Sequence, residues 1–236
     1  VKELVTDLPV PPNYFPSNVK LNREGYLGID EVISKSFKKL NSDYVNYKMK
    51  FNDVVILDTR KSSKYCAEHI PGSIFIGLDG RFAPWVGEII KDINQKIILI
   101  VEKDRAEEAI IRLSRVGFDN CIGYHDGDLK SWKSAGYSTE SIRSISPEQF
   151  IKESHQNSQI IDVREKPELS KGKFQSSINV PLSKIDSSIK FDKNVNSYVY
   201  CSGGYRSVIA CSLIKKNGLK KIVNVEKGFN EIRNLI

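Results

Sequence analysis

One loop of the chain combines a cysteine, two glycines and an arginine in a spacing that suits nucleophilic chemistry. Residues 201–207 read Cys-Ser-Gly-Gly-Tyr-Arg-Ser and separate the apolar run 197–200 from a helical pattern. Where a strand leads into a helix, backbone N–H groups and the helix dipole favour an anion, so they would stabilise the thiolate of Cys201. The glycines allow backbone angles that direct successive N–H groups to one point, and the arginine adds a positive charge.

We therefore predict that Cys201 is a catalytic nucleophile and that Arg206 assists it, by binding the donor or by bracing the loop. The other residues of the loop are predicted to bind the substrate, mainly through backbone N–H groups: Ser202, Gly203, Gly204, Tyr205 and Ser207. The alternative is that Cys201 is a small core residue at a tight turn, as free cysteines often are. The preceding strand, the glycine pair and the arginine together favour the catalytic interpretation.

This loop resembles the active-site loop of rhodanese-type sulfurtransferases. That family places four residues between its Cys and Arg, as between Cys201 and Arg206 here, whereas related phosphatases place five. The resemblance implies that Cys201 takes a sulfane sulfur from thiosulfate or from a low-molecular-weight persulfide such as glutathione persulfide. The Cys201 persulfide would then pass the sulfur to a thiol or to cyanide, and no cofactor is implied.

Two other functions stay open at this point. One is a non-catalytic interaction or regulatory module that shares the rhodanese-like fold, and the other is a thiolate phosphatase or arsenate reductase. A scaffold has no need of Cys201 with its glycines and arginine, and the short loop argues against the phosphatase. The sequence therefore favours sulfur transfer over both.

The chain contains an internal repeat of roughly a hundred residues, the size of a domain. Residues 54–60 align with residues 159–164, and both runs are apolar strand patterns that end in Asp-x-Arg. The resemblance to rhodaneses covers both copies, roughly residues 26–236. Four charged residues are predicted to form structural pairs that brace the strand ends: Asp58, Arg60, Asp162 and Arg164.

The first copy lacks the nucleophile. Alignment of residues 96–101 with residues 197–200 places Glu102 opposite Cys201, and no glycine pair follows. A carboxylate in a loop that is built for an anion would repel an anionic sulfur donor. We predict that this copy is inert as a sulfurtransferase.

Short apolar runs alternate with helical patterns in both copies. Residues 106–116 follow helical spacing with Gly117 as a C-cap, and Ser146 precedes Pro147 as an N-cap precedes a first helical proline. The alternation predicts an α/β fold of two rhodanese-like domains, each a doubly wound, mainly parallel sheet with helices on both faces. The predicted boundaries are a Pro-rich linker over 1–25, an inactive domain over 26–140 and a catalytic domain over 141–236.

The linker region carries a further resemblance. Its prolines predict an extended connector, and residues 12–16, followed by Asn22 and Gly25, resemble the linker between a metallo-β-lactamase-fold persulfide dioxygenase and tandem rhodanese domains in bacterial fusions. Residues 80–85, Gly-Arg-Phe-Ala-Pro-Trp, resemble a segment of the same fusions. Because the chain begins with Val, we expect it to be part of a longer bacterial protein of sulfide metabolism. That protein would carry an N-terminal metallo-β-lactamase-fold domain, to which any metal would belong.

Charge is unevenly distributed along the chain. From residue 143 onward Lys and Arg number 16 and Asp and Glu number 9, whereas residues 1–142 hold 20 of each. The excess would attract small anions to the half that contains Cys201, or it is simply a solvated basic surface. Dispersed lysines without an aromatic–basic platform argue against nucleic-acid binding.

The remaining composition points to a protein of the reducing cytoplasm. The four cysteines are scattered, without a CxxC pair, and a nucleophilic thiol needs a reducing compartment. Cys66 and Cys121 are predicted to be structural or surface residues, and Cys211 is predicted to lie in the core. The apolar runs are too short for a membrane helix, and the three histidines show no zinc-ligand spacing.

Overall fold

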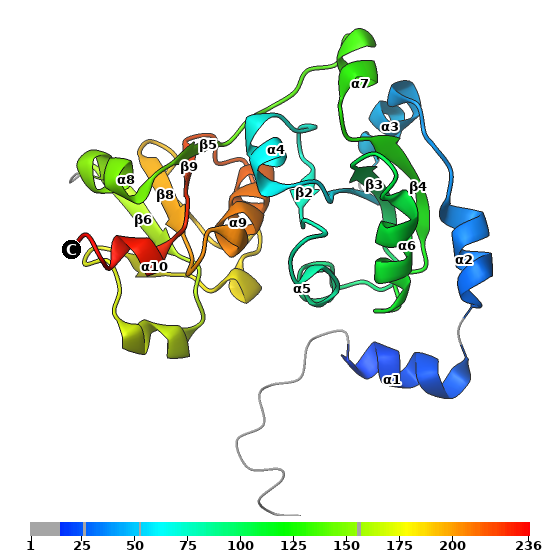
Figure 1. The fold of residues 1–236 in the computed structure, drawn as a ribbon, viewed down its shortest axis with the longest axis horizontal. Coiled ribbons are helices and arrows are strands. Elements are labelled where there is room, and N and C mark those ends of the chain that lie inside the picture. The colour runs from blue at the N-terminus through cyan, green and yellow to red at the C-terminus, as the bar shows by residue number, and fades with distance from the viewer. Residues whose placement is uncertain (1–14, 26, 52, 155–156) are drawn as a thin grey trace, which may run out of the picture.

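The computed structural model describes residues 15–25, 27–51, 53–154 and 157–236. These residues form two parallel β-sheets that follow one another along the chain (Figure 1). We call the part from α2 (Ile29–Ser36) to α7 (Lys130–Ser134) the first unit, and the part from β5 (Arg143–Ile145) to α10 (Phe229–Ile232) the second unit. All strand pairs in both sheets are parallel, which confirms the predicted α/β fold class.

The first sheet has the strand order β2-β1-β3-β4. Its strands are β1 (Val54–Asp58), β2 (Ile74–Phe75), β3 (Lys96–Val101) and β4 (Cys121–Asp126). Alternate residues of β3 belong to separate hydrophobic clusters, Leu99 to one and Ile100 to another, so both faces of the sheet are buried. One face packs with α2, α4 (Ser62–Ala67), α5 (Phe82–Ile89) and α6 (Ala106–Ser114), and the other packs with α3 (Ser42–Met49) and α7.

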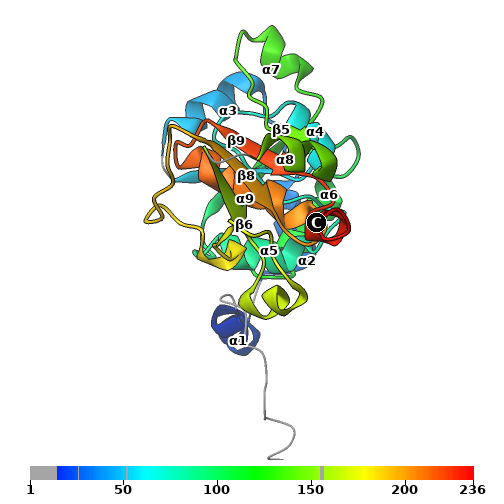
Figure 2. The same cartoon turned by 90° about the vertical axis from the view of Figure 1, so that its left-hand side faces the viewer.

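The second sheet has the strand order β5-β9-β8-β6-β7. Its other strands are β6 (Ser158–Asp162), β7 (Ile178–Asn179), β8 (Asn196–Tyr200) and β9 (Ile222–Val225). The helices α8 (Pro147–Glu153) and α10 cover one face, and α9 (Tyr205–Lys216) covers the other together with the short 3₁₀ segment η3 (Leu182–Lys184). In Figure 2 the second unit faces the viewer and the first unit lies behind it.

A single hydrophobic cluster joins the two units. It includes Leu57 and Leu99 from the first sheet, Val199 from the second sheet, and Ile209 and Cys211 from α9. Figure 1 shows α9 between the second sheet and the β2–α4 region of the first unit. Residues 207–214 of α9 are all buried, as expected for a helix that packs on more than one side.

Of the two predicted helix ends, the N-cap of α8 is confirmed and the C-cap of α6 is displaced by two residues. Ser146 caps α8 by accepting a hydrogen bond from the Gln149 N–H, and Gln149 returns one to the Ser146 N–H, which forms a capping box. The helix α6 ends at Ser114 with Arg115 as its C-cap, two residues before the predicted Gly117. Gly117 follows in a left-handed conformation with φ of 81°, which a residue with a side chain rarely adopts.

The N-terminal segment differs from the predicted extended connector. Residues 15–24 form a helix, α1 (Phe15–Glu24), and residues 1–14 of the predicted linker lie outside the described residues. Pro16 lies in the first turn of α1, where the N–H that proline lacks has no partner within the helix. No further proline follows within α1 to interrupt the helical hydrogen bonds.

Candidate active site

Cys201 lies at the carboxyl end of β8, where the chain turns into α9. Gly204 has φ of 89° and is the N-cap of α9. The carbonyl oxygen of Cys201 accepts a hydrogen bond from the Phe229 N–H at 2.7 Å, and a Cβ on Gly228 would collide with that same carbonyl group. Glycine at 228 is therefore required for the close approach that holds the loop against α10.

The thiol of Cys201 faces the inside of the loop. The N–H of Gly204 donates a hydrogen bond to Sγ at 3.1 Å, and Sγ lies 3.7 Å from the Ser207 hydroxyl. That hydroxyl donates to the Gly204 carbonyl oxygen and so ties the turn to the first turn of α9. Cys201 is only 1% exposed, whereas Gly203 is exposed and has open space where a Cβ would lie. The structure thus aims a backbone donor and a helix N-terminus at the thiol.

Arg206 braces the loop through Glu168, which the sequence analysis did not identify. Its guanidinium donates to both carboxylate oxygens of Glu168, at 2.6 and 2.7 Å, and Ser202 Oγ donates to Glu168 at 2.7 Å. The hydrogen bond from Arg206 lowers the pKa of Glu168 to about 2. Because Arg206 is paired with Glu168, the groups that the structure directs at Cys201 Sγ are the Gly204 N–H and the N-terminus of α9.

Glu168 lies in η2 (Lys166–Lys171), which begins shortly after Arg164. The carboxylate of Glu168 also accepts a hydrogen bond from the Glu165 N–H, which closes a capping box around η2. The acidic residues that follow the second Asp-x-Arg pattern were the only signal in the sequence for such a partner. Their distance from residue 201 along the chain gave no reason to connect them with Arg206.

The Asp-x-Arg pairs form buried ion pairs beneath the strand ends. Arg60 pairs with Asp58 at 2.7 Å, and Arg164 pairs with Asp162 at 2.6 Å, with all four side chains at most 4% exposed. Each guanidinium also donates to backbone carbonyls, including Gly127 for Arg60 and Gly172 for Arg164. These contacts tie β1 and β6 to neighbouring loops at the strand ends.

Tyr205 directs its side chain away from the Cys201 loop. Its hydroxyl donates to the Gly77 carbonyl oxygen of the first unit at 2.8 Å. Only the backbone of Tyr205 is therefore placed to take part in the substrate-binding loop that the sequence analysis predicted. No local pattern in the sequence indicates where this side chain points.

The structure shifts the predicted alignment of the first unit with the second by one residue. Asp58 pairs with Ile100 in the first sheet, and Asp162 pairs with Tyr200 in the second. The residue that corresponds to Cys201 is therefore Val101, not Glu102. The sequence alignment was wrong because it matched the ends of two apolar runs, whereas strand register is fixed by the ladder of hydrogen bonds.

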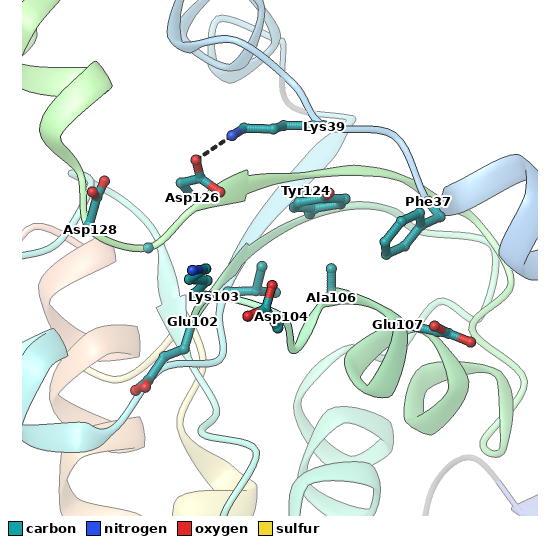
Figure 3. A pocket seen from close by; sticks show the side chains of 12 residues that line it. Phe37, Lys39, Glu102, Lys103, Asp104, Ala106, Glu107, Tyr124, Asp126 and Asp128 are labelled. Atoms are coloured by element: carbon teal, nitrogen blue, oxygen red, sulfur yellow. Dashed lines mark ion pairs between the residues drawn. The ribbon is translucent and has the colours of Figure 1, made fainter.

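A cavity of about 530 Å³ lies over this loop of the first unit. Figure 3 shows Tyr124 and Phe37 on one side of the cavity and Lys103, Asp104 and Ala106 on the other. Further carboxylates line it, namely Glu102, Glu107, Asp126 and Asp128. The lining is therefore acidic and contains no cysteine, unlike the loop at Cys201.

The other three cysteines are buried core residues. Burial raises the pKa of Cys66, raises that of Cys121 to about 12, and raises that of Cys211 well above its usual range. All three thiols therefore stay protonated near neutral pH and are poor nucleophiles. The expectation that Cys211 lies in the core is confirmed, since its side chain is fully buried in the cluster that joins the units.

Among the described residues, no group of three or more His, Cys, Asp or Glu side chains is arranged to hold a metal ion. Across the same parts of the chain, no helix is long and apolar enough to cross a membrane.

The family model for the rhodanese-like domain matches this chain twice, over residues 41–135 and 146–235. The chain belongs to the rhodanese family. The first match covers all four strands of the first sheet, and the second covers four of the five strands of the second sheet, so this is a tandem rhodanese.

Several relatives show partial similarity to this tandem rhodanese. YqhL of Bacillus subtilis, an uncharacterized protein, is 33% identical over 98 residues, which are 40% of this chain and 75% of YqhL. The putative sulfur carrier protein YrkF of the same organism is 30% identical over 43% of this chain and 57% of its own length. A putative mitochondrial thiosulfate sulfurtransferase of Schizosaccharomyces pombe is 37% identical over 28% of this chain and 56% of its length.

Solved structures of the family are also similar. A rhodanese-like domain protein from Staphylococcus aureus has a TM-score of 0.36 at 29% identity and covers 39% of this chain and 91% of its own. A thiosulfate sulfurtransferase from Pseudomonas aeruginosa has a TM-score of 0.39 at 17% identity over 92% of this chain and 46% of its own.

Proposed function

We propose that this chain is a sulfurtransferase that carries sulfane sulfur as a persulfide on Cys201. The observation that carries the proposal is the 3.1 Å hydrogen bond from the Gly204 N–H to Cys201 Sγ, in a loop at the carboxyl end of a parallel strand. Membership of the rhodanese family supports the reaction class. That chemistry requires an anionic sulfur held by backbone donors, and the Gly204 N–H is such a donor.

In the first half-reaction the Cys201 thiolate attacks the outer sulfur of the donor. With thiosulfate, the new bond joins Cys201 Sγ to that sulfur, and the S–S bond of the donor breaks with its electron pair on departing sulfite. With glutathione persulfide, the leaving group is the glutathione thiolate. In both cases the persulfide anion on Cys201 takes over the negative charge of the thiolate, so the N–H of Gly204 and the start of α9 serve both states.

In the second half-reaction an acceptor removes the outer sulfur. Cyanide attacks it, the S–S bond breaks, and thiocyanate leaves while the Cys201 thiolate is restored. A thiol acceptor, reacting as its thiolate, takes the sulfur in the same way and becomes a persulfide. The two steps predict ping-pong kinetics.

The burial of Cys201 supports a small donor. Its side chain is 1% exposed, so a donor must present a terminal sulfur through the mouth of the loop near the exposed Gly203. Thiosulfate and low-molecular-weight persulfides carry such a terminal sulfur. Separate assays with thiosulfate and with a persulfide distinguish between these two donors.

The first unit is proposed to be a non-catalytic rhodanese-like module. Val101, which is 2% exposed, stands in the place of the nucleophile, and the loop after it carries Glu102 and Asp104. For the second unit, a phosphatase or arsenate reductase is disfavoured, because Cys201 and Arg206 are separated by four residues and Arg206 is already bound by Glu168.

A cytoplasmic location and an N-terminal metallo-β-lactamase-fold domain remain proposals. They are supported by the free cysteines and by the similarity of residues 12–16 and 80–85 to the bacterial fusions. Sequencing the gene through its upstream region would show whether such a domain is encoded in frame.

The central test is cyanolysis with thiosulfate and with glutathione persulfide in separate assays. We expect thiocyanate formation with at least one donor, and a mass increase of one sulfur atom on the Cys201 peptide after donor alone. Cys121→Ala, which removes another buried thiol, is the matched control and should retain transfer. Thiocyanate formation by Cys201→Ser at the wild-type rate would contradict the proposal.

A further inference from the structure

Tyr205 connects the Cys201 loop to the first unit. Its Oη donates to the Gly77 carbonyl oxygen at 2.8 Å, and its ring meets Phe75 edge-on with ring centroids 5.9 Å apart. Burial raises the pKa of Tyr205 above its usual range, so the hydroxyl stays protonated and able to donate. A residue of the proposed catalytic loop is thus fixed by a carbonyl group of the other unit.

The first unit leaves a space for this ring. A Cβ on Gly80 would lie 2.7 Å from Tyr205 Oη, which is too close for non-bonded atoms. Arg112 of α6 holds the same segment by donating to the carbonyl oxygens of Leu78 and Gly80. The surface that receives Tyr205 is therefore fixed in position within the first unit.

A second contact joins α9 to the first unit, at a point further along the helix from the Cys201 loop. The N–H of Phe75 donates to Ser212 Oγ at 3.1 Å, and Ser212 is 1% exposed. This contact joins the units without touching the Cys201 loop. It therefore provides a way to separate the stability of the interface from the position of the loop.

We infer that the first unit, although it lacks a nucleophile, positions the catalytic loop of the second unit through Tyr205. Tyr205 lies between Gly204, whose N–H binds Cys201 Sγ, and Arg206, which pairs with Glu168. Displacement of the Tyr205 backbone would move both groups. Tyr205 is accordingly a positioning residue rather than a catalytic one. The kinetic part of this inference rests on the proposed sulfurtransferase function.

The decisive experiment changes the first unit only. In the full chain, Gly80→Ala should push the Tyr205 ring out of its space. We expect about a tenfold fall in kcat/KM for cyanolysis and in the rate of Cys201 alkylation by iodoacetamide, which is the rate equivalent of one lost hydrogen bond. Gly28→Ala is the matched control, because Gly28 directly precedes α2 of the first unit and a Cβ there meets nothing within 4 Å.

A double-mutant cycle tests whether the effect passes through Tyr205. In a Tyr205→Ala background the added methyl group at residue 80 has no ring to displace, so Gly80→Ala should cause no further fall. Tyr205→Phe keeps the ring and removes the hydroxyl, and it should lose several-fold in both rates. A full Gly80→Ala effect that persists in the Tyr205→Ala background would overturn the inference.

Ser212→Ala separates positioning from stability. It removes the contact with the Phe75 N–H and should lower the free energy of unfolding, while kcat/KM and the alkylation rate stay at the wild-type value. If Ser212→Ala slows both reactions as much as Gly80→Ala, the loop responds to general loosening and the inference is wrong. Absence of sulfur transfer in the wild type would reject the proposed function, whereas the alkylation rates would still test the positioning role.

Discussion

The two strand-end loops of this protein share their place in the sheet and a left-handed residue but carry different chemistry. Each follows a strand in which a residue near the end pairs with the aspartate of an Asp-x-Arg pair, Ile100 in the first unit and Tyr200 in the second. Each then contains a left-handed residue just before a helix, Asp104 with φ of 61° and Gly204 with φ of 89°. The fold thus fixes the shape of the loop, while a few side chains determine whether it can hold a reactive sulfur.

The difference extends to the brace behind each loop. In the second unit the carboxylate of Glu168 stands outside the loop and binds Arg206 and Ser202 within it. In the first unit the charges are reversed, because the loop residue Glu102 pairs with Lys64 at 3.1 Å. Lys64 and Glu168 follow their Asp-x-Arg aspartates by the same number of residues. The first loop therefore carries its own negative charge where the second offers donors to an anion.

The largest expected effect concerns the nucleophile. Cys201→Ser should lower sulfur transfer by about a thousandfold or more, because serine is not ionised near neutral pH. Adding Val101→Cys to that variant should give no appreciable rescue, because the first loop lacks the glycine pair and carries Glu102 and Asp104. Cyanolysis rates of the single and double variants provide the measurement.

A graft of the whole loop sharpens this comparison. Replacing residues 101–107 by the sequence of residues 201–207 supplies the glycines and the arginine together and should restore more transfer than Val101→Cys alone. Strong activity from Val101→Cys alone would show that the surrounding donors are not what makes Cys201 reactive.

The next effect concerns the brace of the active loop. Arg206→Ala removes both bonds to Glu168, and we expect transfer to fall about thirtyfold, or ~2 kcal/mol. Arg143→Ala removes a comparable but exposed pair with Glu153 and serves as the control, with little change in kcat/KM. Equal activity of Arg206→Ala and the wild type would show that the loop keeps its shape without the pair.

The two residues with a left-handed backbone, Gly204 and Asp104, allow substitutions with opposite expected effects on stability. Gly204→Ala introduces a Cβ that would lie 2.8 Å from the Lys227 nitrogen, and it should lower the free energy of unfolding by about 2 kcal/mol. Asp104→Gly relieves the same backbone conformation in the first loop and should raise that free energy by less than ~1 kcal/mol. Urea unfolding of both variants checks the opposite signs. A loss of stability in Asp104→Gly would indicate that its side chain contributes a contact of its own.

Another small expected effect is a pH dependence at Glu168. Its folded pKa of about 2 lies below the unfolded value of 4.5, so the brace stabilises the fold fully above about pH 4.5 and loses this contribution as pH falls towards 2. Glu168→Gln should therefore lower the free energy of unfolding by about 1 kcal/mol at pH 7. The difference from the wild type should shrink below pH 4.5, and a difference that is constant down to pH 2.5 would contradict the assignment.

Much of the fold follows from local patterns in the sequence. The apolar runs, the helical spacing before Gly117 and the Ser146 cap each reflect interactions between near neighbours, and all appear in the structure. The loop after β8 could also be placed, because its glycines and its position between strand and helix are visible in the chain.

The features that the sequence did not predict all depend on contacts between segments that are distant along the chain. Glu168 is selected by its distance from Arg206 in space, and Tyr205 is turned by a carbonyl group of the other unit. The correct partner of Cys201 in the first unit, Val101, depends on the pairing of β3 with β1. None of these is encoded by neighbouring residues, so no local pattern could identify them.

The buried position of α9 also bears on how this protein unfolds. Since one apolar cluster includes residues of both sheets and of α9, melting of either unit would expose the side chains of the other to water. We expect the two units to melt together as a single cooperative transition in calorimetry rather than as two separate peaks. The amide protons of residues 208–214 should then exchange with solvent only through global opening, and they should be among the slowest in the molecule.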